Sequence, residues 1–476
     1  MKNILMKKNI LVALLCAIMI FSGLGCKKSG EKYELPIEVW GTFDNSNAFS
    51  EIFDEYAKIN KSITAVNYRK VTLESYKKDL LNGLAAGNGP DVFMIQNSWL
   101  PDFQDKIVPV SQIIVAEDEF RKTFVDVVAE DMIVDGQIYG VPLSVDSLGL
   151  YYNKDIFNAA GITRPPQTWE EFDKAVQALT EFDEFGNIKK SGAAMGTSYN
   201  KGGAINVNKA SDILALLMIQ NGASMSSKTS GIIDFGKSTN TGENSIAAGE
   251  KALEYYVKFA SAGSNVYTWD KGRNYSIDEF FEGKTAMTIN YSYHYDTIKA
   301  KNEKLNFAVT DVPQISLQDI GSQANYANYW VFVVAKNKVP VQPDDKRLAP
   351  ITDQMRVYES WQFLRAMTFP SAQGITLANA VNGEKSLYPT EFDFTEKYLT
   401  ETGKPAARRD IIEKQKNDVR LGAFARGNLI ARTWRRHDAD AVDAIFYDMI
   451  DRVNTGQMSS SQSISLGEQR AQQLQN

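Results

Sequence analysis

The hydrophobic positions of the chain follow two periods, one typical of strands and one typical of helices. Residues 35–40, 65–71 and 91–95 are short, mostly apolar runs, which predicts strands. Residues 48–59 and 75–86 carry apolar side chains three and four positions apart, which predicts helices packed on a sheet. This alternation of strand and helix predicts a parallel sheet with helices on both faces.

The same periods predict further elements. Residues 140–154 form an extended segment interrupted by Pro142 and Gly149, which suits a strand that crosses between domains. Thr168 and Glu171 form a capping box that opens a helix ending near residue 180. Further helices are predicted at 211–220, 247–260, 276–282, 357–367, 441–453 and 466–474, and further strands at 285–290 and 329–335.

The N-terminus has the layout of a secretory signal peptide. Residues 1–8 carry three lysines and no acid, and residues 9–23 are mostly apolar but shorter than the roughly 20 residues that cross a bilayer. The end of this run resembles a bacterial lipobox, although Gly23 and Leu24 depart from its preferred residues. We expect cleavage after residue 25, a lipid on Cys26 and a polar tether over 26–33. An ordinary secretory signal with an incidental cysteine is the alternative.

Composition excludes several classes of protein. The 476 residues, 43% of them hydrophobic, are enough for two domains, and the net charge of −6 argues against a nucleic-acid binder. Removal of residues 1–25 with their three lysines gives a mature charge of about −9. Two cysteines and two histidines leave little room for a zinc site or a disulfide framework, so we expect no metal and no cofactor.

No catalytic motif stands out in the sequence. His294 and His437 lie outside any hydrolase motif, and the chain contains no Gly-x-Ser-x-Gly elbow, phosphate loop or His-Glu-x-x-His sequence. We therefore expect a protein that is not an enzyme. A surface glycosidase stays open as an alternative, because its two carboxylates carry no sequence signature.

The tryptophans are more informative. Trp169 and Trp361 fall within predicted helices and are expected in the core, whereas Trp40, Trp99, Trp269, Trp330 and Trp434 fall at strand ends, in loops or at a helix start. Flat aromatic rings pack on the apolar faces of sugars, and polar side chains that suit sugar hydroxyls stand near some of them: Asp44, Gln96 and Asn97. The alternative is that a large core uses these tryptophans too.

Five motifs occur in an order that resembles the extracellular solute-binding proteins of ABC sugar importers, the family that includes maltodextrin-binding lipoproteins. They are GNGPDVF at 87–93, YGVPL at 139–143, LYYNKDIF at 150–157, PQTWEEF at 166–172 and FEGKTAMTIN at 281–290. The resemblance spans nearly all of the mature chain.

The resemblance implies an α/β periplasmic-binding-protein-like fold of type II. Two lobes, each a mainly parallel sheet flanked by helices, are joined by a hinge and close on a ligand. Mapped onto this chain, the N-terminal lobe comprises 34–145 and 292–336, and the C-terminal lobe 148–289 and 340–476. The crossing segments would lie near 145–149, near 290–293 and after residue 334.

The resemblance also implies which residues contact a carbohydrate. Asp44 and Asn45 follow the first strand, Asp146 lies in the first crossing, and Tyr293 and Trp434 match stacking positions. The other candidates are Gln96, Asn97, Trp99, Trp269 and Trp330.

The function implied is that of a monomeric, lipid-anchored extracytoplasmic receptor that delivers a mono- or oligosaccharide to ABC importer permease subunits, without nucleic acid as a partner. The alternatives are a peptide, polyamine or polyol phosphate ligand on the same fold, and an adhesin or sensor. The segment 420–436, with five arginines and no acid, could contact an anionic sugar, the transporter or only solvent, and the last is the preferred interpretation.

Overall fold

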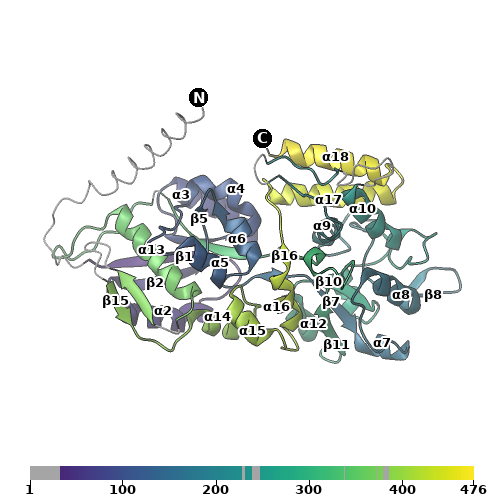
Figure 1. Ribbon diagram of the computed structural model, residues 1–476, viewed down its shortest axis with the longest axis horizontal. Coiled ribbons are helices and arrows are strands. Elements are labelled where there is room, and N and C mark those ends of the chain that lie inside the picture. The colour runs from purple at the N-terminus through teal and green to yellow at the C-terminus, as the bar shows by residue number, and fades with distance from the viewer. Residues whose placement is uncertain are drawn as a thin grey trace.

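Two α/β lobes lie side by side in the computed structural model (Figure 1). The structure describes residues 33–227, 231–237, 247–336, 338–371, 374–378 and 385–475. The predicted signal peptide, Cys26 and most of the tether lie outside these residues, so the cleavage and the lipid remain predictions. Within the described ranges, no helix is both long and apolar enough to cross a membrane.

The first lobe is built on the sheet that the sequence predicted. β1 pairs in parallel with β2 and β3, and β13 joins β3 in antiparallel orientation. Helix α2 buries Phe49, Ile52 and Tyr56 on this sheet, as the three-and-four spacing of its apolar residues requires. The elements are β1 (Leu35–Gly41), α2 (Asn47–Ile59), β2 (Ile63–Lys70), α3 (Leu73–Ala85), β3 (Val92–Gln96) and β13 (Trp330–Val334).

Helices from late in the chain complete the first lobe. Trp361 and Phe363 of α13, Tyr398 of α14 and Ile412 of α15 belong to the same hydrophobic core as β1. This differs from the predicted boundary, which placed all of 340–476 in the other lobe. The remaining elements here are α4 (Leu100–Phe103), α5 (Glu117–Thr123), α6 (Asp126–Met132), β4 (Ile133–Val134), β5 (Gln137–Ile138), α13 (Asp353–Thr368), β14 (Ile375–Ala378), β15 (Lys385–Tyr388), α14 (Phe394–Thr402) and α15 (Arg409–Gln415).

The second lobe has a different sheet from the one expected. β7 lies between β10 and β11, and both pairings are antiparallel, whereas the prediction was a mainly parallel sheet in each lobe. Helix α9 is buried along its whole length in the core of this lobe. The elements are β7 (Gly149–Asn153), α7 (Lys154–Ala159), α8 (Trp169–Leu179), β8 (Glu181–Phe182), β9 (Ile188–Lys190), α9 (Ala210–Gln220), α10 (Ala248–Val257), α11 (Ser276–Phe281), β10 (Met287–Asn290), α12 (His294–Lys301), β11 (Phe307–Asp311), α17 (Ala439–Asn454) and α18 (Ser460–Gln473).

Helix α12 and strand β11 also differ from the predicted lobe assignment, which gave 292–336 to the first lobe. β11 pairs with β7, and Ile298, Leu305 and Phe307 pack on Tyr151 of the second lobe. Pairing with β7 decides the position of β11, and the local sequence carries no signal for that partner.

The two lobes are connected by a small hinge sheet. The hydrophobic core changes from one lobe to the other between Val145 and Leu148, between Ala327 and Tyr326, and after Ala431. At these points β6 (Asp146–Ser147), β12 (Asn325–Asn328) and β16 (Ala431–Arg432) form a sheet in the order β16-β12-β6. The second and third crossings therefore lie at β12 and β16, not near 290–293 and after residue 334 as expected.

Helix α16 (Gly422–Leu429) packs directly on this hinge sheet. A Cβ added to Gly427 would lie 2.4 Å from Nδ2 of Asn325 and 2.5 Å from Oγ of Ser147, so only glycine allows this approach. Asn428 Nδ2 donates to the carbonyl of Val145 at 2.6 Å. The helix thus holds two of the three crossing strands together.

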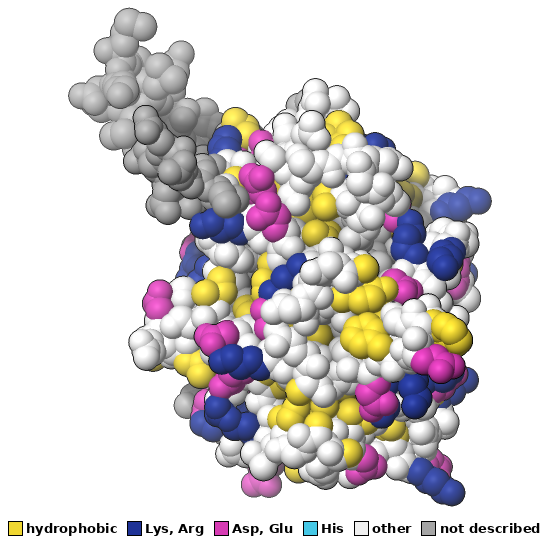
Figure 2. All heavy atoms as spheres, turned by 90° about the vertical axis from the view of Figure 1, so that its right-hand side faces the viewer, with side chains coloured by type: hydrophobic (Ala, Val, Ile, Leu, Met, Phe, Trp, Pro, Cys, Tyr) yellow, Lys and Arg dark blue, Asp and Glu magenta, His cyan; other side chains and the backbone are white. Residues whose placement is uncertain are grey.

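The outer face of the second lobe, in the part drawn in colour, carries side chains of both charges. Figure 2 shows Lys and Arg side chains interspersed with Asp and Glu, and hydrophobic side chains in small groups between them.

Candidate functional site

A cavity of about 760 Å³ lies between the two lobes above the hinge sheet. Its lining comes from the first lobe, the hinge and the second lobe, so a bound molecule would contact all three. This volume is in the range of binding sites for small ligands.

The wall on the first lobe is aromatic. Trp330 opens β13 and is half-buried, and its ring packs edge-on against Phe43 and Trp99 with centroid distances of 5.0 Å each. Phe43 is 44% exposed and follows β1, while Trp99 follows β3. These rings meet because the carboxyl ends of the parallel strands β1 and β3 reach the same edge of the sheet.

The floor of the cavity is a row of polar side chains across the hinge. Gln96 Nε2 donates to Oδ1 of Asn328 at 2.9 Å, and the register of the hinge sheet sets Asn328 opposite Asp146. Asp146 accepts hydrogen bonds from the backbone N of Ser292 at 3.0 Å and from its Oγ at 2.7 Å. Burial raises the pKa of Asp146 to about 7, partly offset by these hydrogen bonds.

The wall on the second lobe presents a tyrosine. Tyr293 is 53% exposed, and its ring stacks on Tyr291 at 6.2 Å and packs against His294 at 4.3 Å. Burial, and then the charge of Lys209, lowers the pKa of His294 to about 4, so this imidazole is neutral at physiological pH. An exposed ring held by two buried neighbours is a rigid flat surface.

Charged groups beside Tyr291 extend this wall. Tyr291 donates to Oδ2 of Asp212 at 2.8 Å, and Lys209 Nζ lies 3.9 Å from the same carboxylate. Arg436 donates to the Tyr326 hydroxyl at 3.1 Å and lies 3.4 Å from Asp443.

Five of the ten predicted ligand residues line the cavity: Gln96, Trp99, Asp146, Tyr293 and Trp330. They come from both lobes and the hinge, and the structure brings them to one place although up to about half of the chain separates them.

Three predicted polar residues lie outside the cavity lining. Asp44 accepts hydrogen bonds from Tyr398 Oη at 2.7 Å and Lys404 Nζ at 2.6 Å, so its carboxylate is held by neighbours in its own lobe. Asn45 accepts from Lys70 Nζ at 3.0 Å and is exposed outside the cleft. Asn97 is buried and donates to Asp131 at 3.0 Å.

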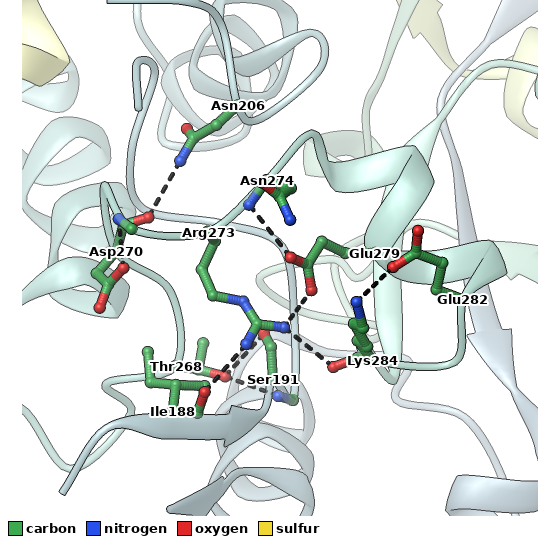
Figure 3. Close-up of polar contacts among 12 residues, drawn as sticks. Ile188, Ser191, Asn206, Thr268, Asp270, Arg273, Asn274, Glu279, Glu282 and Lys284 are labelled. Carbon is green, nitrogen blue, oxygen red and sulfur yellow. Dashed lines mark hydrogen bonds and ion pairs between the residues drawn. The ribbon is translucent and has the colours of Figure 1, made fainter. Parts of the chain in front are cut away.

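Trp269 lies in the core of the second lobe with 0% exposure, which corrects the expectation that it faces the ligand. Arg273 covers its ring with the guanidinium carbon 5.4 Å from the centroid. The residues around it are held by the polar network in Figure 3, in which Arg273 donates to Glu279 and to the carbonyl of Ile188. The position is structural because its loop folds back into the core.

Trp434 is also placed in the core, 6% exposed, and is absent from the cavity lining. The guanidinium of Arg436 lies 4.8 Å above its ring, and Arg436 does line the cavity. The expectation that Trp434 stacks directly on the ligand is therefore corrected. Its ring instead packs under Arg436, which lines the cavity.

The arginines of 420–436 make contacts within the chain. Arg420 pairs with Asp296, Arg426 with Asp311 at 2.8 Å, and Arg436 with Asp443. Arg432 and Arg435 donate to the carbonyls of Gly321 and Asp131 at 3.4 Å each. This basic run joins the hinge region to both lobes, in place of the purely solvated face that was preferred from the sequence.

Several lining residues were not predicted, namely Phe43, Lys77, Lys209, Ser292, Asn328, Lys404 and Arg436. Ser292 lies within the predicted second crossing, near 290–293, so the sequence did carry a signal for it. Asn328 could be found only with the register of the hinge sheet.

Comparison with known proteins gives matches over most of the chain. The family model described as bacterial extracellular solute-binding protein matches residues 51–340. The maltodextrin-binding protein MdxE of Bacillus subtilis is 26% identical over 66% of this chain and 69% of its own length. A putative binding protein of Brucella abortus is 31% identical over 26% of this chain, a match that spans only 30% of that relative.

Solved structures share the fold. The cyclic α-maltosyl-1,6-maltose binding protein from Arthrobacter globiformis has a TM-score of 0.69 and 18% identity, and the match covers 93% of this chain and 99% of that one. The sugar-binding protein MalE from Xanthomonas citri has a TM-score of 0.67 and 19% identity, with coverage of 92% and 97%. At these identities the likeness establishes the two-lobe architecture.

Proposed function

The chain belongs to the bacterial extracellular solute-binding protein family, and on this premise we propose that it is a receptor that binds a carbohydrate between its two lobes. The sugar contacts aromatic rings on both walls and polar groups on the hinge floor. It favours the arrangement in which both walls touch it, because a ligand shifts an equilibrium toward the state that binds it better.

The observation that carries this proposal is the pair of aromatic surfaces on opposite walls. Trp330 and Tyr293 line one cavity from different lobes, with Gln96, Asn328 and Asp146 between them. Aromatic rings suit the apolar faces of sugar rings, while amide and carboxylate groups suit hydroxyls. The names of relatives that bind maltodextrin, lactose and galactooligosaccharide support the same ligand class.

We further propose that the receptor acts outside the cytoplasmic membrane as a monomer, anchored by a lipid on Cys26, and passes the sugar to the permease subunits of an ABC importer. The description of the family as extracellular supports the location. Fatty-acid labelling of the wild type, with Cys26→Ala as the unlabelled control, tests the anchor.

Titration calorimetry against a glycan panel tests the carbohydrate function. The panel contains maltotriose, cellotriose, mannobiose, lactose and galactotriose, with a tripeptide, spermidine and glycerol 3-phosphate as representatives of the other ligand classes. We expect saturable binding of at least one sugar, with the sugar recovered unchanged. Recovery of shortened sugar would instead indicate a glycosidase, and binding of only a non-sugar would reject the proposal.

A further inference from the structure

The cations of the cleft are already neutralised by the protein itself. In the part of the chain that the structure describes, five cationic side chains line the cavity, and a carboxylate lies within 4.0 Å of each. The pairs are Lys77–Asp102, Lys209–Asp212, Lys404–Asp44, Arg420–Asp296 and Arg436–Asp443.

The cavity lining carries five carboxylates beside its five cations, and three more carboxylates stand behind it. Asp44, Asp102 and Asp212 lie behind the lining. The cations that they neutralise therefore need no carboxylate from the lining itself. Among the described residues, Glu74, Asp146 and Asp440 line the cavity without a cationic partner. Glu74 and Asp440 are exposed, one from each lobe.

Acidic side chains lie at the three helix N-termini that border the cavity, where they oppose the attraction of these N-termini for anions. α3, α9 and α17 begin at the cavity, where Leu73, Lys209 and Ala439 line it. The N-terminus of a helix carries partial positive charge and binds anions. Here the first turns of these three helices already carry Glu74, Asp212 and Asp440.

A fourth helix end adds negative potential. α14 ends at Thr402, and Thr402 and Gly403 line the cavity, so the carbonyl end of this helix lies at the cavity. The carboxyl end of a helix carries partial negative charge. If the carboxylate of an acidic sugar paired with one of these cations, the protein carboxylate that now neutralises the cation would lose its partner. Breaking a partly buried ion pair in this way costs free energy.

We infer that the cleft selects sugars without acidic groups, and that Glu74 and Asp440 are residues that exclude uronate and sulfated glycans. This inference rests on the proposed carbohydrate function and narrows its ligand class. Specificity of this kind arises from like-charge repulsion against the wrong ligand, in addition to attraction toward the right one.

Matched neutral and acidic trisaccharides test the inference. Maltotriose, cellotriose and mannotriose are each titrated beside the derivative in which C6 is oxidised to a carboxylate, in buffers of low and high ionic strength. For the wild type we expect the carboxylated form of the sugar that binds to be at least tenfold weaker, and the gap to narrow with salt.

The variants Glu74→Gln, Asp440→Asn and the double variant supply the second arm. Each single change should reduce the ratio of acidic to neutral dissociation constants about three- to tenfold, the size expected for one charge at a distance of several ångströms in a partly solvated site. Glu184→Gln, an exposed acid in the turn between β8 and β9, is the matched control and should leave the ratio unchanged.

Equal binding of the neutral and acidic forms by the wild type, or preference for the acidic form, would overturn the inference and leave the carbohydrate function standing. An unchanged ratio in the double variant would remove Glu74 and Asp440 from this role. Absence of binding for every sugar would reject the proposed function itself.

Discussion

The carboxylate of Asp146 accepts two hydrogen bonds from Ser292, from the backbone N at 3.0 Å and from Oγ at 2.7 Å. Asp146 lies on the hinge strand β6, and Ser292 lies on the loop between β10 and α12 in the second lobe. A carboxylate offers about four acceptor positions, so capacity remains for ligand hydroxyls. One side chain thus connects the hinge, the second lobe and the cavity.

Sugar affinity should depend on pH through Asp146. Its pKa of about 7 means that the carboxylate gains a proton as the pH falls from 8 to 6, which removes a charged acceptor. We expect affinity to fall about three- to tenfold over this interval, measured by titration calorimetry. Asp146→Asn should bind more weakly at pH 8 and lose this dependence. An identical pH profile in that variant would show that another group is responsible.

Asp146 should also affect stability. Its pKa is raised in the folded state above the value near 3.9 of an unfolded chain, so the protonated form favours folding. That contribution is complete below pH 4 and is lost as the pH rises through 7. We expect Asp146→Asn to increase the free energy of unfolding at pH 8 by about 1–2 kcal/mol relative to the wild type, measured by urea denaturation. No gain at pH 8 would contradict the assignment.

Tyr293 should contribute binding energy without contributing much to folding. Its ring is 53% exposed, and we expect Tyr293→Ala to weaken sugar binding about tenfold with little change in melting temperature. Phe185→Ala is the matched control, because Phe185 is 81% exposed in the turn between β8 and β9. Equal effects of the two variants on affinity would rule out a specific platform.

Trp269 should behave as a core residue. It is fully buried, and its indole nitrogen has no hydrogen-bond partner among the described residues, so phenylalanine removes volume and no hydrogen bond. We expect Trp269→Phe to lower the free energy of unfolding by about 1–3 kcal/mol and to leave sugar affinity within twofold. Thermal unfolding and calorimetry measure the two quantities. A large loss of affinity in a folded Trp269→Phe protein would restore the original ligand role.

Removal of the Thr433 hydroxyl should destabilise the hinge. Thr433 follows β16 directly, and its hydroxyl donates to the buried carboxylate of Asp131. Thr433→Val leaves that carboxylate with one donor fewer, and we expect a loss of about 1–3 kcal/mol in stability. The freed crossing segment should also raise the radius of gyration of the ligand-free protein, measured by small-angle X-ray scattering. Thr455→Val, whose hydroxyl bonds only to backbone carbonyls at the end of α17, should change neither quantity measurably.

The strands and helices of the first lobe could be predicted because each carries its own period. β1, α2, β2, α3 and β3 all lie within a few residues of the expected ranges. The antiparallel sheet of the second lobe could not, because pairing of β7 with β10 and β11 depends on contacts between distant segments. The hinge strands β6 and β16 have two residues each, too short to show a period.

The site was predictable where side chains follow strands and unpredictable where loops fold back. Gln96 ends β3 and Trp99 follows it, and both reach the cavity as the parallel sheet requires. Trp269 lies in a loop whose direction is set by Arg273 and Glu279, and no local pattern shows that its ring points inward. The neutralisation of the cations that line the cavity depends on ion pairs between distant segments, such as Lys404 with Asp44.

A crystal structure with the best-binding sugar of the glycan panel tests the central claim most directly. We predict electron density for the sugar in the cavity between the lobes, with one ring face against Trp330, another against Tyr293, and hydroxyls within hydrogen-bonding distance of Asp146 or Asn328. Sugar density outside this cavity, or an empty cavity in crystals grown at saturating sugar, would contradict the account.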